Sequence, residues 1–145
     1  MMLLSDAAAT ERIGALLAER MRVGDVVMLQ GDLGAGKTTL ARGLLYGLGF
    51  HGDVVSPTFP IVQTYEGTEI RIPLWHVDLY RIEDPEELEE LGLEEARGHA
   101  ALVIEWPERL GDRWPDALRL RLAPQEGGRS LTAHVPAAWE GRWPP

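Results

Sequence analysis

Hydrophobic residues fall into two kinds of pattern along the chain, one typical of buried strands and the other of amphipathic helices. Residues 26–29 and 101–104 are uninterrupted apolar runs, which predict strands that are covered on both faces of a sheet. Between residues 6 and 20, and again from Leu40 to Leu48, apolar positions recur at helical spacing. We therefore expect a helix over residues 6–20 and a second helix that ends at a Gly49 cap.

Two pairs of shorter apolar stretches predict antiparallel hairpins. Residues 61–65 and 70–75 flank a turn at residues 66–68, and residues 118–122 and 131–135 are separated by Gly127-Gly128. Strands joined in this way would extend the parallel sheet that the two buried runs predict.

An acidic segment follows the first hairpin and has a strong helix start. Asp84 stands at the cap position, Pro85 at the first helical position and Glu87 at the third. Eight acidic residues fall between Glu83 and Glu95. We expect one helix here whose charged face is solvated, with a docking surface for another protein as the alternative.

A glycine-rich loop joins the strand at residues 26–29 to the helix that contains Leu40. Gly31-x4-Gly36-Lys37-Thr38 matches the phosphate-binding pattern G-x-x-x-x-G-K-[ST], and it has the required strand before it and helix after it. Glycines let successive backbone N–H groups point inward, and the positive end of the helix dipole is aimed at the same place. The pattern predicts that Lys37 reaches the β- and γ-phosphates and that the Thr38 hydroxyl is a ligand of Mg²⁺.

The motif and the order of elements together predict a fold class. We expect a three-layer α/β fold of the P-loop NTPase type, with a mostly parallel sheet, antiparallel hairpin strands and helices on both faces. Residues 1–145 would form one domain, with a frayed tail at residues 141–145.

Composition narrows the function further. The chain has no cysteine and a formal net charge of −9, which excludes a disulfide framework and a thiolate metal site and argues against tight direct binding to nucleic acid. It has no asparagine, and Lys37 is its only lysine, so it cannot supply the N-K-x-D loop of a guanine-specific GTPase. ATP is therefore the expected nucleotide. Because no apolar run approaches 18 residues and no signal-peptide pattern is present, we expect a cytoplasmic protein that does not insert into a membrane.

Several residues outside the loop are candidates for the site. Glu105 ends a buried strand, so it should emerge at the phosphate edge of the sheet, where a carboxylate can hold Mg²⁺ or orient the attacking water; an ordinary solvated glutamate is the alternative. Asp78 follows the strand expected at residues 70–75 and reaches the same edge, unless it only forms a turn. Thr58 lies in a proline-bracketed segment, which is compatible with a switch loop or with a plain turn. His76 is interpreted as structural, and Trp106 as a core residue or part of a partner-facing surface.

Five ordered blocks of residues resemble those of the TsaE (YjeE) family. They are the glycine-rich loop, Ser56-Pro57-Thr58-Phe59, His76-Val77-Asp78-Leu79-Tyr80-Arg81, the helix start at Asp84, and Val103-Ile104-Glu105-Trp106-Pro107-Glu108. The family consists of small bacterial P-loop ATPases needed for the threonylcarbamoyladenosine modification of tRNA. The resemblance implies a Mg²⁺-dependent ATPase that works with TsaD and TsaB, where TsaD carries out the transfer to adenosine and hydrolysis resets the complex. The tRNA would be held by the partners, in agreement with the acidic charge.

The resemblance also implies roles for individual residues. Lys37, Asp78 and Glu105 would be catalytic, and Thr38 and Glu105 would hold the metal. Arg129 resembles a family position near the nucleotide. The expected nucleotide-binding residues are Gly31, Asp32, Leu33, Gly34, Ala35, Gly36, Lys37, Thr38, Thr39, Thr58, Asp78 and Arg129.

Two other functions use the same loop. A small-molecule kinase would need an acceptor pocket and usually an arginine-bearing lid, and residues 83–95 include no Arg or Lys. A nucleotide-gated binding module would need the loop but no essential hydrolysis. Both remain as alternatives to the ATPase.

Overall fold

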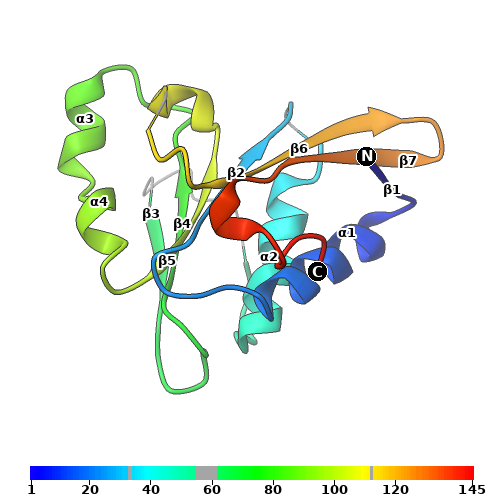
Figure 1. Ribbon diagram of the computed structural model, residues 1–145, viewed down its shortest axis with the longest axis horizontal. Helices are drawn as coiled ribbons and strands as arrows, with labels where there is room; N and C mark the ends of the chain where they lie inside the picture. Colours follow the sequence, from blue (N-terminus) through cyan, green and yellow to red (C-terminus); the bar gives the residue numbers. More distant parts are fainter. Residues whose placement is uncertain (33, 55–61, 112) are drawn as a thin grey trace.

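A seven-stranded mixed sheet forms the centre of the protein, which we describe from a computed structural model covering residues 1–32, 34–54, 62–111 and 113–145. The strands lie in the order β1-β7-β6-β2-β5-β4-β3 (Figure 1). The four central strands β6, β2, β5 and β4 are parallel, whereas β1, β7 and β3 pair antiparallel at the two sides. Their bounds are β1 Met2–Leu4, β2 Val26–Gln30, β3 Val62–Tyr65, β4 Leu74–Asp78, β5 Ala101–Glu105, β6 Leu118–Gln125 and β7 Gly128–His134.

Helices cover both faces of the sheet and make three layers. The longer helices α1 (Ala7–Ala18) and α2 (Lys37–Leu48) pack against each other on one face (Figure 1). The other face is covered by the short helices α3 (Pro85–Glu90) and α4 (Leu93–Ala96) and by the 3-10 turn η1 (Pro107–Leu110), while a second 3-10 turn, η2 (Ala137–Trp139), follows β7. The expected three-layer α/β architecture is confirmed. Among the described residues, none of the helices has the length and apolar character needed to cross a membrane.

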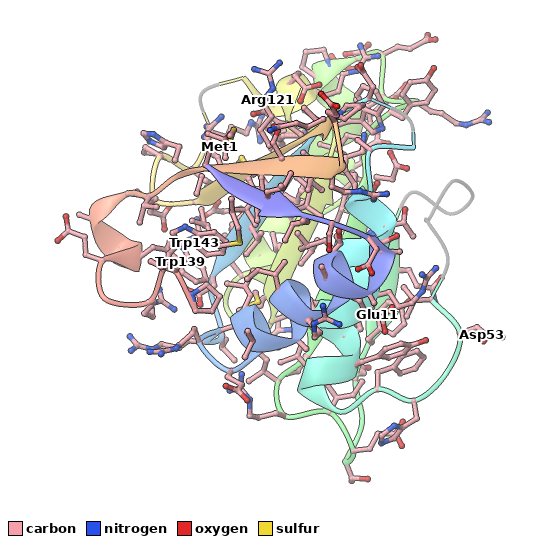
Figure 2. All side chains as sticks on the ribbon, turned by 90° about the vertical axis from the view of Figure 1, so that its right-hand side faces the viewer. Met1, Glu11, Asp53, Arg121, Trp139 and Trp143 are labelled. Carbon is pink, nitrogen blue, oxygen red and sulfur yellow. The ribbon has the colours of Figure 1, made fainter. Side chains whose placement is uncertain are left out.

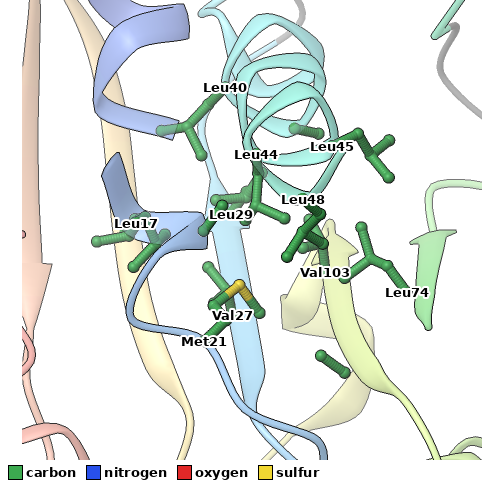
Figure 3. Close-up of a cluster of buried hydrophobic side chains, with 14 of the residues drawn as sticks. Leu17, Met21, Val27, Leu29, Leu40, Leu44, Leu45, Leu48, Leu74 and Val103 are labelled. Atoms are coloured by element: carbon green, nitrogen blue, oxygen red, sulfur yellow. The ribbon is translucent and has the colours of Figure 1, made fainter. Parts of the chain in front are cut away.

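The alternation of side chains along β2 divides the hydrophobic core between the two layers. Val27 and Leu29 join the cluster under α1 and α2, whereas Val26 and Met28 join the cluster under α3, α4 and η1. Figure 3 shows the first cluster, in which leucines of α2 meet Leu17 of α1 and the side chains of β2. The uninterrupted apolar run of β2 is explained by this burial on both faces, because neither face is available to water.

The strand that carries Asp78 is displaced from its expected position. The hairpin partner of β3 was expected at residues 70–75, but β4 spans Leu74–Asp78. Ile70 and Ile72 are buried in the connection instead, and the backbone N–H of Arg71 donates to Leu48 O at the end of α2. Ile70 and Ile72 are therefore hydrophobic because they are buried at the end of α2, and this local pattern is the same as that of a strand. As a result, Asp78 is the last residue of β4 rather than a residue beyond the strand.

The acidic segment forms two short helices rather than one. Asp84 caps α3 as expected, with its carboxylate accepting from the backbone N–H of Glu86 at 3.0 Å. The helix then stops, and Gly92 takes a φ of 68°, in the left-handed region that favours glycine, before α4 begins. This turn redirects the chain so that Leu88 and Leu93 both reach the sheet.

The end of the chain is anchored, in contrast to the frayed tail expected at residues 141–145. Arg142 forms a bidentate ion pair with Asp25, with distances of 2.6 and 3.0 Å, and also donates to the carbonyl oxygens of Arg20 and Ala138. Trp139 is fully buried, and Trp143 packs against the same core cluster (Figure 2). Residues 141–145, with one glycine and two prolines, are therefore held to the fold by Arg142 and by the indole rings of Trp143 and the preceding Trp139.

Candidate functional site

The glycine-rich loop runs from the end of β2 directly into α2. Gly36 occupies the cap position of α2 with a φ of 108°, and the helix starts at Lys37 without a side-chain hydrogen bond to its first turn. Backbone N–H groups in the first turn of a helix have no intrahelical acceptor, and the helix dipole makes their surroundings positive. This end of α2 therefore has the donors and the potential that suit an anion such as phosphate.

Arg129 of β7 lies directly on the loop. Its Nη1 donates to Ala35 O at 3.3 Å, and a Cβ added at Gly36 would lie 2.1 Å from the same nitrogen. A glycine at position 36 thus satisfies both the backbone conformation and the close approach of the guanidinium. The structure places Arg129, predicted from the resemblance, beside the loop, although it follows Lys37 by 92 positions in the sequence.

Lys37 is folded back onto its own loop. Its ammonium group donates to Gly31 O and lies 3.7 Å from the centroid of the Trp106 indole ring. Only 5 % of Lys37 is exposed. Burial lowers the pKa of Lys37 from its usual 10.5, and the negative charges of Glu105, Asp78, Glu108 and Asp32 oppose that shift.

Two carboxylates end neighbouring parallel strands next to Lys37. Asp78 of β4 and Glu105 of β5 are directly opposite each other in the strand register, and both are buried. Asp78 also accepts from the backbone N–H of Tyr80 at 2.9 Å, so it organises the turn after β4 as well as lining the site. The burial of Glu105 excludes the alternative that it is an ordinary solvated glutamate. For Asp78, the structure shows both a place in the cavity and the hydrogen bond of a turn-forming residue.

Glu105 is held from the side by His76. The distance from His76 Nε2 to Glu105 Oε2 is 2.6 Å, with His76 fully buried and Glu105 only 2 % exposed. An ionised carboxylate can only accept hydrogen bonds, so His76 Nε2 carries the hydrogen whenever Glu105 is charged. The imidazole therefore interacts with one of the two oxygens of the strand-end carboxylate.

The loop, the two strand-end carboxylates and Arg129 line one cavity of about 420 Å³. Its lining is polar along the loop and along the strand ends, with aromatic side chains at one side. The lining residues are Gly34, Gly36, Lys37, Thr38, Thr39, Asp78, Tyr80, Arg81, Glu105, Trp106 and Arg129.

The cavity brings together most of the residues predicted from the sequence. Gly31 and Asp32 lie at the start of the loop and line a second cavity of about 230 Å³ instead, and Ala35 lines neither, although its backbone contacts Arg129. Leu33 and Thr58 were also predicted to bind the nucleotide, and both lie outside the described residues.

Four residues at the site were not predicted to act there: His76, Tyr80, Arg81 and Trp106. Trp106 lines both cavities, and its ring centroid lies 4.9 Å from that of Tyr80. His76 could have been found from the sequence, because residues two apart in a strand share a face and His76 precedes Asp78 by two. The sequence analysis did not make this inference, because it expected the strand to end at residue 75, before His76 and Asp78.

The donor set fits a magnesium ion that binds together with phosphates. The Thr38 hydroxyl and the carboxylates of Asp78 and Glu105 are oxygen donors on one cavity. Mg²⁺ is usually held by one or two protein carboxylates, with the other positions taken by phosphate oxygens and water.

A central parallel strand, β2, leads through a glycine-rich loop into a helix, and carboxylates stand at the ends of β5, which pairs with β2, and of β4, the next strand beyond β5. The strand, loop and helix place the protein in the P-loop class of α/β proteins.

Comparison with known proteins identifies the family within that class. The family model described as threonylcarbamoyl adenosine biosynthesis protein TsaE matches residues 4–131, and the chain belongs to the TsaE family. A tRNA threonylcarbamoyladenosine biosynthesis protein TsaE of Streptomyces coelicolor is 46 % identical over 112 residues, which are 76 % of each chain. The Bacillus subtilis protein of the same name is 41 % identical over 120 residues, covering 82 % of this chain and 73 % of the relative.

A solved structure agrees with this assignment. The crystal structure of Bacillus subtilis YdiB superimposes with a TM-score of 0.77 at 28 % identity, covering 94 % of this chain and 86 % of the other. The resemblance noted in the sequence is thus confirmed at the level of family and fold.

Proposed function

We propose that this protein is a Mg²⁺-dependent ATPase that serves the threonylcarbamoyladenosine modification of tRNA. One observation carries the proposal: Lys37, Asp78 and Glu105 converge on a single cavity at the N-terminus of α2. A cation at the loop and carboxylates at the strand ends are the groups that phosphoryl transfer requires. The TsaE relatives named for this tRNA modification support the cellular role.

Each residue would contribute a distinct interaction. The backbone N–H groups at the start of α2 would bind phosphate oxygens, and Lys37 would leave Gly31 O and Trp106 to reach the terminal phosphates. Thr38 and Glu105 would hold Mg²⁺, which neutralises the charge developing on the phosphate oxygens. Asp78 and Glu105 would orient the attacking water, and Arg129 would bind the phosphate chain beside Gly36.

The expected nucleotide is ATP. The chain contains no asparagine and has no lysine other than Lys37, so it lacks the side chains of the guanine-reading N-K-x-D loop. We propose that ATP binds in preference to GTP and that Mg²⁺ is required for turnover.

Turnover would depend on partner proteins. We propose that the chain acts with homologues of TsaD and TsaB in the cytoplasm, and that tRNA contacts those partners rather than this subunit. The net charge of −9 supports this division, because nucleic-acid binding relies on clustered Lys and Arg.

The test is ATP hydrolysis by the full chain, alone and with TsaD and TsaB. We expect slow turnover alone, faster turnover with both partners, and loss of turnover in Glu105→Ala with ATP binding retained. Glu140→Ala is the control, because Glu140 is an exposed glutamate that follows η2 and lines neither cavity.

Other results would replace the proposal. Background hydrolysis by the wild-type protein with both partners would contradict the ATPase. Unchanged tRNA modification by Glu105→Ala would favour a nucleotide-gated binding module. Phosphate transfer to a panel of nucleosides and small metabolites would favour a kinase.

A further inference from the structure

His76 makes one contact that the proposed reaction does not by itself require. On β4 it precedes Asp78 by two residues, so both side chains point to the face of the sheet that carries α2 and the loop. Its strand neighbour on β5 is Val103, and Glu105 is the next residue on that face. The imidazole therefore reaches Glu105 diagonally across two parallel strands.

The His76 side of this contact is buried among apolar residues. His76 has no exposed surface and Glu105 has 2 %. Val103 and Leu74, which occupy the same face one step further from the loop, belong to the hydrophobic core. Within the described residues, His76 Nδ1 is a buried side-chain atom without a hydrogen-bond partner.

A polar group in such a position carries a cost. Burying a nitrogen without a hydrogen-bond partner destabilises the fold, and an aliphatic side chain of similar size would avoid that cost. Among the residues that the structure describes, the imidazole has its one side-chain hydrogen bond with Glu105 Oε2, at 2.6 Å. The interaction that offsets the burial is therefore directed at the carboxylate.

We propose that His76 is a positioning residue that, by donating from Nε2 to Glu105 Oε2, holds the Glu105 carboxylate in the orientation used for Mg²⁺ and water. This inference rests on the proposed function, because it assigns Glu105 a role in hydrolysis. The bond restricts rotation of the carboxylate about its last single bond. It therefore prepares the site before a nucleotide enters.

The first test needs no ligand and no activity. In the ligand-free protein, long-range ¹H–¹⁵N correlation spectra distinguish which nitrogen of each histidine carries a proton. We expect a proton on His76 Nε2 that exchanges slowly with solvent, and faster exchange in Glu105→Ala. A bare Nε2 in the wild-type protein would overturn the proposal.

The second test compares two substitutions of His76 whose side-chain amide groups lie at different distances from the backbone. In His76→Gln the side-chain NH₂ stands near the position of Nε2, whereas in His76→Asn it stands near Nδ1 and does not reach Glu105. We expect His76→Asn to lower kcat by about 10–100-fold, as for other residues that orient a metal ligand, with KM for ATP unchanged. His76→Gln should recover most of kcat.

The two variants also separate positioning from folding. Both replace an imidazole by an amide, so a purely structural role would lower melting temperature and kcat alike in both. Equal kcat in Asn and Gln variants, whether reduced or at the wild-type level, would overturn the proposal. Absence of hydrolysis by the wild-type protein with its partners would instead reject the proposed function, and the tautomer measurement would still decide whether the hydrogen bond exists.

Discussion

The Lys37 ammonium lies 3.7 Å from the centroid of the Trp106 ring, and in the same position it donates to Gly31 O. The cation of the loop thus lies on an aromatic face at the wall of the cavity, since Lys37 and Trp106 both line it. A cation over an indole ring is stabilised by roughly 0.5–2 kcal/mol, depending on how much water is excluded. Phosphates can displace this contact, because they offer the ammonium a full negative charge.

Displacement of Lys37 from Trp106 should be visible in fluorescence. We expect binding of Mg²⁺ with ADP or ATP to change the intrinsic tryptophan emission, and Trp106→Phe to remove most of that change. The control is Trp114→Phe, because Trp114 lines neither of the two cavities that Trp106 lines. An unchanged signal in Trp106→Phe would show that nucleotide binding leaves this contact in place.

Replacing Lys37 by arginine should abolish hydrolysis, although both side chains are cationic. The loop encloses a compact ammonium that is only 5 % exposed, whereas a guanidinium is larger, planar and forked. We expect Lys37→Arg to lose about 10²–10³-fold in kcat, the cost typical of removing a charge-stabilising donor. ATP turnover near the wild-type level, measured by phosphate release, would contradict the role assigned to Lys37.

The single lysine provides a direct measurement of its own pKa. Burial lowers the pKa of Lys37 from 10.5, so the neutral, reactive amine should form at lower pH than in an exposed lysine. Labelling with an amine-reactive reagent, followed by peptide mass spectrometry, should rise with pH and reach half its maximum below 10.5. Bound Mg²⁺-nucleotide should suppress the labelling. A midpoint at or above 10.5 in the ligand-free protein would show that the nearby carboxylates outweigh the desolvation.

Loss of the Arg129 guanidinium should weaken nucleotide binding. Arg129 contacts the loop at Ala35 and lines the cavity beside Gly36, where it can donate to phosphate. Hydrogen bonds to charged groups contribute about 1.5–3 kcal/mol, so we expect Arg129→Ala to raise Kd for ATP by roughly 10–100-fold. Arg119→Ala on the neighbouring strand β6 is the control in isothermal titration calorimetry. Equal Kd values for the two variants would remove Arg129 from the site.

The Arg142 anchor should affect stability without affecting nucleotide binding. Arg142→Ala leaves Asp25 without its bidentate partner near the start of β2 and exposes part of Trp139, over which the guanidinium lies at 4.0 Å. We expect the free energy of unfolding to fall by about 2–3 kcal/mol. Urea denaturation measures the change, and Kd for ATP should stay constant. A loss below about 0.5 kcal/mol would indicate the weak contribution of an ordinary surface ion pair.

Elements with a strong periodic pattern were predictable from the sequence, and those whose boundaries depend on distant contacts were not. The continuous apolar runs became β2 and β5, because a strand that is buried on both faces has no polar position to interrupt it. Residues 70–72 have the same character but pack at the end of α2, and local pattern does not distinguish a buried connection from a strand. The three-residue strand β1 is too short to produce any pattern at all.

The sequence by itself determined the family, the α/β class and the phosphate-binding loop, because these depend on residue types at fixed local spacing. Glycines, a lysine and a threonine within eight positions specify the loop whatever surrounds it. Only the tertiary structure decided which side chains meet there. Trp106 on Lys37, His76 beside Glu105 and Arg129 on Gly36 join residues 29 to 93 positions apart. Strand register and sheet order create these contacts, and both are set by packing across the whole core.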